Sequence, residues 1–258
     1  SPMTGVQTCA LPICQTSNYV SNSLTVYRGK LYAANIDAQD EKDWCHVFRY
    51  EGGEQWADCG RVGNGKTTVV MAMIVHQGDL YAATTTYDWT RVETGDYDLC
   101  RVYRYEGDKQ WKDCGQPGTC LRINCIASYL GKLYVGGDRG YLLPDEKTWS
   151  GRPYKVHVYE GGTQWRVSGE FTSERRKSLY AHAMAVHDGK LYAGYPTVYS
   201  FDGKQWEYVG TPLGQTPQEL LPTLQVHSLE VYQGKLYAGM WPQARAVVYQ
   251  GGTEWSDR

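Results

Sequence analysis

The chain has 258 residues, a formal net charge of −2, and only three Phe beside 22 Tyr and nine Trp. This length fits one all-β domain, the near-neutral charge provides no basic surface for nucleic acid, and no apolar run reaches the length of a membrane span. We therefore expect a single domain that neither binds nucleic acid nor inserts into a membrane.

The first residues are expected to lie outside the fold. Residues 1–16 form a leader in which Thr4–Ile13 looks like a translated sequencing-adapter read, as found in metagenomic or transcriptomic assemblies. We therefore expect the native start, and any signal peptide, to be missing. An upstream domain can have been lost with it.

One pattern occurs five times in the remainder of the chain. The phrase Gly-Lys/Asp-Leu-Tyr begins at positions 29, 78, 131, 189 and 234, so that successive copies lie 49, 53, 58 and 45 residues apart. Each copy is followed by an aromatic residue, a glycine-containing turn and a tryptophan: Tyr50 to Trp56, Tyr105 to Trp111, Tyr159 to Trp165, Phe201 to Trp206 and Tyr249 to Trp255. Such a period indicates a solenoid, a propeller or an array.

The first repeat shows what each unit builds. Ser23–Tyr27 alternates polar and apolar residues, a short turn follows, and Leu31–Ala34 continues as a second β-prone run. His46–Tyr50 and Gln55–Asp58 form a second pair around a Glu-Gly-Gly turn. We therefore predict an all-β, five-bladed β-propeller with four antiparallel strands per blade. It spans residues 17–258, with blades at about 22–60, 71–115, 124–169, 182–210 and 227–258.

The repeat resembles the kelch repeat, in which a strand that ends in small residues precedes a tyrosine strand and a tryptophan strand. The double glycine of kelch repeats stands at Gly136-Gly137, and the other copies depart from it: Ala33-Ala34, Ala82-Ala83, Ala193-Gly194 and Ala238-Gly239. Kelch proteins usually have six or seven repeats, and the number five looks more like the tachylectin class of lectins, whose motifs are absent here. The resemblance implies an architecture, and propellers include both enzymes and binding proteins.

Cysteines occur in pairs in two of the repeats. Cys45 and Cys59 lie 14 residues apart on the third and fourth predicted strands, and Cys100 and Cys114 repeat both positions. Counting from the turn places residue 45 opposite 59 or 60, near enough for a cross-strand disulfide. Small buried thiols are the alternative interpretation. Oxidised pairs would favour an extracellular location.

The loops that join the second strand to the third, and one blade to the next, differ in every repeat. Because binding residues collect on variable loops held by a rigid scaffold, we predict the functional surface on that face. Aromatic rings for stacking and charged groups for hydrogen bonds suit a glycan or a protein. The loop candidates are Asp37, Trp44, Tyr87, Trp89, Asp138, Arg139, Trp149 and Trp241, and Tyr195, which leaves a second strand, is a candidate at the central mouth.

The central mouth of the propeller provides a second candidate region. The residues at equivalent positions where the innermost strands begin are Asn22, Met71, Asn124, His182 and His227. His182 and His227 are expected to face each other from adjacent blades. Without a third ligand they predict no metal site, and no sequence motif predicts a cofactor.

The sequence predicts a non-enzymatic recognition domain, expected to be monomeric, that binds a glycan or a protein through this face and mouth. The ring at the mouth has no Asp or Glu, whereas glycoside hydrolysis needs a pair of carboxyl groups. A glycoside hydrolase or lyase that uses Asp37, Asp138 or other loop acids is the first alternative. A sensor or scaffold domain of a larger protein is the second.

Overall fold

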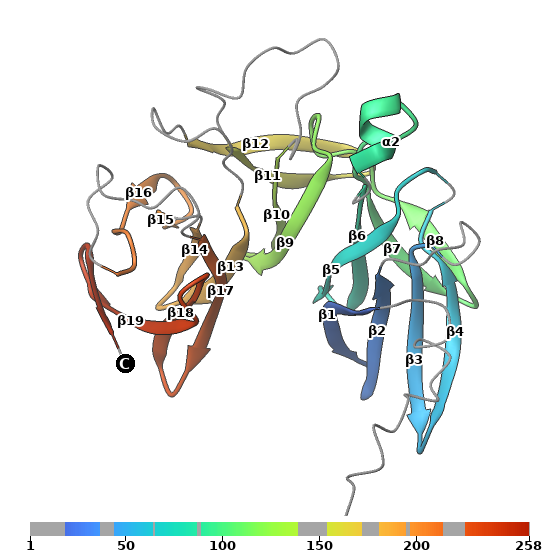
Figure 1. The fold of residues 1–258 in the computed structure, drawn as a ribbon, viewed down its shortest axis with the longest axis horizontal. Helices are drawn as coiled ribbons and strands as arrows, with labels where there is room; N and C mark the ends of the chain where they lie inside the picture. The colour runs from blue at the N-terminus through green and yellow to red at the C-terminus, as the bar shows by residue number, and fades with distance from the viewer. Residues whose placement is uncertain are drawn as a thin grey trace, which may run out of the picture.

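The computed structural model describes residues 19–36, 44–63, 65–86, 89–138, 154–171, 181–194, 197–213 and 225–257. They form five antiparallel sheets of four strands each, and the strand order within every sheet follows the chain. The chain is therefore an all-β, five-bladed propeller (Figure 1). No helix in these ranges is long and apolar enough to cross a membrane.

Each blade takes four consecutive strands, the first of which is innermost. Blade 1 is β1 (Tyr19–Tyr27), β2 (Lys30–Ile36), β3 (His46–Gly52) and β4 (Gln55–Arg61); blade 2 is β5 (Val69–His76), β6 (Asp79–Thr85), β7 (Val102–Gly107) and β8 (Gln110–Asp113). Blade 3 is β9 (Arg122–Tyr129), β10 (Lys132–Asp138), β11 (Tyr154–Gly161) and β12 (Gln164–Phe171). Blade 4 is β13 (Ala183–His187), β14 (Lys190–Gly194), β15 (Val198–Phe201) and β16 (Trp206–Tyr208); blade 5 is β17 (Gln225–Tyr232), β18 (Lys235–Trp241), β19 (Arg245–Gly251) and β20 (Glu254–Asp257).

The Gly-Lys-Leu-Tyr phrase forms a tight hairpin between the first two strands of a blade. In blade 1, Tyr27 pairs with Lys30, and the two residues between them have positive φ, 49° at Arg28 and 74° at Gly29. Two-residue hairpins favour this conformation because its twist matches that of the strands. The glycine is therefore a requirement of the turn.

The tryptophan of the fourth strand joins its blade to the preceding one. Trp111 Nε1 of blade 2 donates to the Cys59 carbonyl oxygen of blade 1 at 3.0 Å, and Trp165 Nε1 of blade 3 donates to that of Cys114 at 2.8 Å. Trp206 and Trp255 make the same bond to Ser168 and Val209. The repeated tryptophan thus stabilises the contact between neighbouring blades, and it is not a candidate for ligand contact.

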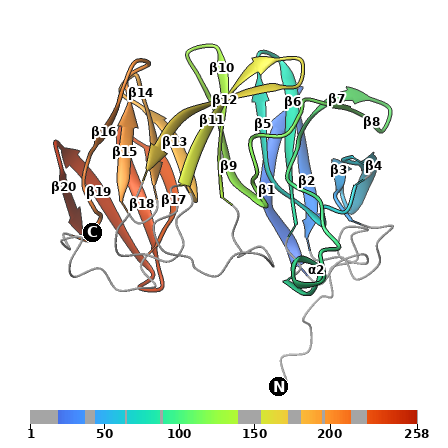
Figure 2. The ribbon, with the colours of Figure 1, turned by 90° about the horizontal axis from the view of Figure 1, so that it is seen from above.

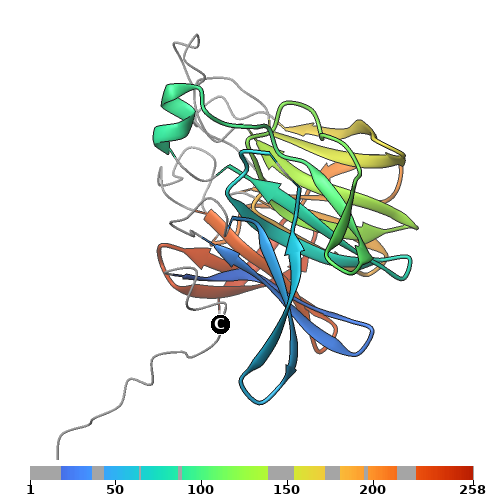
Figure 3. The same cartoon turned by 90° about the vertical axis from the view of Figure 1, so that its right-hand side faces the viewer.

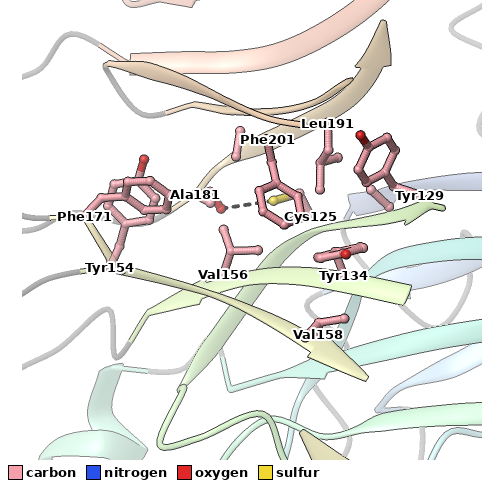
Figure 4. Close-up of a cluster of buried hydrophobic side chains, with 12 residues drawn as sticks. Cys125, Tyr129, Tyr134, Tyr154, Val156, Val158, Phe171, Ala181, Leu191 and Phe201 are labelled. Atoms are coloured by element: carbon pink, nitrogen blue, oxygen red, sulfur yellow. Dashed lines mark hydrogen bonds between the residues drawn. The ribbon is translucent and has the colours of Figure 1, made fainter. Parts of the chain in front are cut away.

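Hydrophobic clusters fill the space between successive blades. Between blades 3 and 4, Tyr134 and Val156 pack against Leu191 and Phe201 (Figure 4). Cys125 Sγ donates to the Ala181 carbonyl oxygen across this interface at 3.2 Å. Similar clusters lie between blades 1 and 2, 2 and 3, and 4 and 5. The protein has no single central core.

The paired cysteines are buried thiols in the structure, so the predicted disulfides are not formed. A bulge between His46 and Phe48 shifts the register, and the Val62 amide donates to the Cys45 carbonyl oxygen at 2.9 Å. Cys45 therefore lies opposite Val62, and the count that placed it opposite residue 59 or 60 was wrong. Its Sγ donates instead to the Thr67 carbonyl oxygen at 3.3 Å. These thiols give no support to an extracellular location.

The two ends of the blades differ in what they carry. Figures 2 and 3 show helix α2 (Trp89–Thr94) on one face and the β5–β6 and β9–β10 hairpin turns on the opposite face. The innermost strands begin on the α2 face. That face therefore carries the mouth residues, the loops that join the second strand of a blade to the third, and the connections from one blade to the next.

Candidate functional site

Three of the predicted mouth residues lie at β-bulges of the innermost strands. In blade 3 the pairing of β9 with β10 passes from Ile123 to Cys125, which leaves Asn124 without an opposite residue. Met71 in β5 and His227 in β17 are skipped in the same way. A bulge re-aims its side chain out of the normal alternation of a strand. The same local irregularity therefore sets these side chains apart in three of the innermost strands, β5, β9 and β17.

His182 and His227 face each other from neighbouring blades, as the sequence predicted. Their ring centroids are 4.0 Å apart, with 34° between the ring planes. Burial is the main factor that lowers the pKa of His182 to about 4, and the imidazole of His227 adds to this effect. Burial also lowers the pKa of His227. Both imidazoles are consequently neutral at neutral pH, and a neutral imidazole has one donor and one acceptor nitrogen.

Asn124, in β9 of blade 3, adds an amide to the site. Its Nδ2 is buried and has no hydrogen-bond acceptor among the residues that the structure describes. A buried amide without a partner is uncommon and costs about 1–3 kcal/mol. An acceptor from a ligand or an ordered water would relieve this cost. Asn124 therefore marks the mouth as a place that is polar and incompletely satisfied.

Trp241 provides an exposed aromatic surface beside His227. It ends β18, its side chain is 46% exposed, and its ring centroid lies 6.3 Å from that of His227. An indole pairs an apolar face with one donor. We use the name mouth site for four residues together: Asn124, His182, His227 and Trp241.

Arg122 is a charged neighbour of the mouth site that the sequence reasoning missed. It lies at the start of β9, and its positive charge is among the causes that lower the pKa of His182. In the sequence, the signal for Arg122 was its position two residues before Asn124. A single arginine at the start of a strand is, however, common on protein surfaces. Only the packing of blade 3 against blade 4 shows that it affects the histidine.

Trp44 occupies a different environment from the one expected for a ligand-stacking ring. It is buried, with the guanidinium carbon of Arg91 4.3 Å from its ring centroid and that of Arg61 at 6.0 Å. Arg91 Nη1 also pairs with Asp96 Oδ2 at 2.7 Å, and Lys66 Nζ pairs with the other oxygen of that carboxylate. Trp44 therefore packs within a charged cluster beside α2 and presents no open face.

Several predicted site residues fall outside the part of the chain that the structure describes. These are Asp37, Tyr87, Arg139, Trp149 and Tyr195. For Asn22 in β1, Trp89 at the start of α2 and Asp138 at the end of β10, the structure describes the backbone alone. The leader with its adapter-like stretch also lies outside.

The described residues contain no group of three His, Cys, Asp or Glu suited to a metal ion. The carboxyl groups among them with a resolved pKa shift all have it lowered: Glu51, Asp58, Asp96, Glu160 and Asp202. A glycosidase acid needs a raised pKa so that it remains protonated. These five groups are therefore ion-paired or hydrogen-bonded carboxylates, and none of them is placed to act as such an acid.

Comparison with known proteins supports the fold and goes no further. No family model matches the chain, and no curated protein matches its sequence. Among solved structures, YjhT is 10% identical with a TM-score of 0.57, and the match covers 91% of this chain and 82% of YjhT. Luciferin-regenerating enzyme is 11% identical with a TM-score of 0.55, over 94% of this chain and 76% of the enzyme.

The computationally designed Ika8 protein is 12% identical with a TM-score of 0.54. That match covers 93% of this chain but spans only 61% of the designed chain. At these identities the likeness extends to the propeller fold alone. The assignment of a function therefore depends on the residues of the mouth site.

Proposed function

We propose that this protein is a recognition domain that binds a neutral carbohydrate at the mouth site. The observation that supports this most directly is the neutral pair His182 and His227, to which blade 3 adds the buried amide of Asn124, whose Nδ2 has no partner among the described residues. Neutral donors and acceptors match sugar hydroxyls, and they add no charge that a ligand would have to compensate. The kelch-like character of the repeats agrees with this role but does not choose between a binder and an enzyme.

The exposed ring of Trp241 completes the chemistry that a sugar requires. The C–H face of a pyranose packs on an aromatic ring, while the hydroxyl groups at its edge take directional hydrogen bonds. In this site the ring comes from blade 5, and the hydrogen-bonding groups come from β9, β17 and the residue before β13. Three consecutive blades therefore contribute to one binding surface.

A glycan array followed by calorimetry tests the proposal. Trp241→Ala and Asn124→Ala are each expected to weaken binding of the selected glycan at least tenfold, equivalent to about 1.4 kcal/mol. Tyr208→Ala is the matched control for the tryptophan, because Tyr208 is 44% exposed but lies on β16, an outer strand. Met71→Leu is the control for the ring position, because it changes an equivalent bulge residue that has no polar group.

Three results would overturn the proposal. The first is the absence of glycan binding combined with binding to a protein partner. The second is equal loss of affinity in Trp241→Ala and Tyr208→Ala, which would place the ligand elsewhere. Turnover of a polysaccharide that is lost on Asp37→Asn would replace a recognition domain with the hydrolase or lyase.

A further inference from the structure

Each blade presents one face to the blade before it and another to the blade after it. In β5, Met73 packs into the cluster shared with blade 1, whereas its neighbour Ala72 packs into the cluster shared with blade 3. Because successive side chains of a strand point to opposite faces, neighbouring residues of β5 pack against different blades. Every blade therefore carries an incoming face and an outgoing face, and a covered blade needs a partner for both.

The incoming face of blade 1 lacks the partner that the other blades have. Leu24 and Val26 of β1 are 58% and 64% exposed. Met73, which occupies the position of Leu24 in blade 2, is 8% exposed because blade 1 covers it. On this face of blade 1, Ala33, Phe48 and Trp56 form a cluster with no residue from another blade.

The missing partner also leaves one of the repeated interblade hydrogen bonds unformed. The tryptophans of blades 2 to 5 each donate Nε1 to a carbonyl oxygen of the preceding blade. Trp56 Nε1 of blade 1 is also shielded from solvent, but it has no acceptor in the described part of the chain. The indole is thus placed for the repeated interblade bond, and the carbonyl oxygen is what it lacks.

The outgoing face of blade 5 is uncovered in the complementary way. Tyr232, at the end of β17, is 62% exposed, whereas Tyr27 and Tyr129 at the same position in blades 1 and 3 are 5% and 4% exposed. Ser228 and Glu230, which point to the same side of β17, are exposed as well. Leu24, Val26 and Tyr232 are thus exposed at positions where a neighbouring blade covers the equivalent residues of other blades.

The end blades are not packed against each other in the described part of the chain. Four interblade clusters join five blades, whereas a closed ring of five would need a fifth cluster. The innermost strands contact one another in the series β1, β5, β9, β13 and β17, without a comparable contact between β17 and β1. In Figure 1 the ribbons of β1 and β17 lie apart, in the right-hand and left-hand parts of the molecule.

We propose that these two end faces form one docking site for a further four-stranded blade of the same repeat. The incoming face of such a blade packs on Tyr232 of blade 5, and its outgoing face covers Leu24 and Val26. A carbonyl oxygen of its fourth strand accepts the hydrogen bond from Trp56 Nε1. The four internal interfaces define this partner, because each of them joins the same two kinds of face.

A separate blade explains the observations better than a second copy of the chain does. One blade carries one incoming and one outgoing face, so it satisfies both ends of the arc at once. A second copy that docks on blade 5 would satisfy one end and would bring four further blades with it. Such a head-to-tail contact leads to larger rings or filaments.

The test adds a blade to the full chain and compares it with the unmodified protein. A copy of residues 60–115 joined after residue 258 continues the repeat in register, because Trp255 corresponds to Trp56. The extended protein is expected to be monomeric by light scattering, to bind less of a hydrophobic dye, and to melt at a higher temperature. A shuffled copy of the same segment is the control, and it is expected to leave the melting temperature unchanged.

The decisive readout is the response to Trp56→Phe, with Trp111→Phe as the matched control. In the extended protein both substitutions remove an interblade hydrogen bond, and each is expected to lower Tm by about 2–4 °C. In the unmodified chain only Trp111→Phe is expected to have this effect. An equal effect of Trp56→Phe in both proteins would overturn the proposal. So would an unmodified chain that is a stable dimer, or a monomeric Leu24→Cys, Tyr232→Cys double variant in which the two introduced thiols form a disulfide.

Discussion

Acidification is expected to destabilise the protein through its buried histidines, and His182 gives the sharpest test. Burial and the neighbouring His227 lower the pKa of His182 to about 4 in the folded protein, whereas the unfolded chain titrates near 6.5. Between these values the unfolded chain binds more protons than the folded one. The free energy of unfolding therefore falls as the pH falls.

The size of the effect follows from the two pKa values of His182. The stability that it contributes is fully present above pH 6.5 and is lost progressively toward pH 4. Between pH 7 and pH 4.5 about two pKa units are traversed, and each unit corresponds to about 1.4 kcal/mol. His182 alone is thus expected to remove about 2–3 kcal/mol over this interval.

Urea unfolding followed by tryptophan fluorescence at pH 7 and pH 4.5 measures this loss. In His182→Asn the difference between the two pH values is expected to be smaller than in the wild type by about 2–3 kcal/mol. His157→Asn is the control, since burial also lowers the pKa of His157 to about 4, at a position in β11. It should reduce the pH dependence similarly and leave glycan binding unchanged. An unaltered pH dependence in His182→Asn would refute the reasoning.

Three further predictions concern the packing between and within blades. Tyr154→Phe is expected to raise the free energy of unfolding by about 1 kcal/mol in urea titrations, because the buried hydroxyl has no partner; a loss of stability would show that the hydroxyl is bonded. Gly115→Ala is expected to cost about 1–3 kcal/mol, because φ is 92° and the new Cβ would lie 2.2 Å from the Thr163 carbonyl oxygen; an unchanged Tm would contradict this. Cys59 and Cys114 are expected to react with a thiol reagent only after unfolding, because burial raises the pKa of both thiols. Non-reducing mass spectrometry that found either cysteine in a disulfide would disprove this expectation.

The fold was predictable because its signals are local and repeated. The turn at Arg28-Gly29 needs positive φ at both residues, and the sequence shows the same kind of turn in every repeat. Alternating strands on either side of such turns leave few alternatives to an antiparallel sheet. Five copies of this unit therefore predicted five four-stranded sheets.

The register of individual strands was less predictable than the fold. Cys45 was expected opposite residue 59 or 60, but the bulge after His46 places it opposite Val62. A bulge changes the side-chain facing of every residue beyond it, and no residue type in this strand announces one. The prediction of the disulfides failed for that reason.

The candidate site was found in part. Equivalence between repeats was enough to place His182 and His227 opposite each other, because the repeats are superimposable units in neighbouring positions. The burial of Trp44 beneath Arg91 was not predictable, since it depends on how α2 packs against the end of blade 1. A tryptophan in a loop looks the same in the sequence whether it is open or covered.

The sequence by itself therefore determined the repeating unit: its strands, its hairpin turns and the positions that recur at the mouth. Those features depend on contacts between residues that are close in the chain. The tertiary structure alone decided how the units meet, including the neutral histidine pair, the unpartnered Nε1 of Trp56 and the two uncovered end faces. These depend on packing between blades, and a repeat that carries the same two faces in every copy does not specify where the series of blades stops.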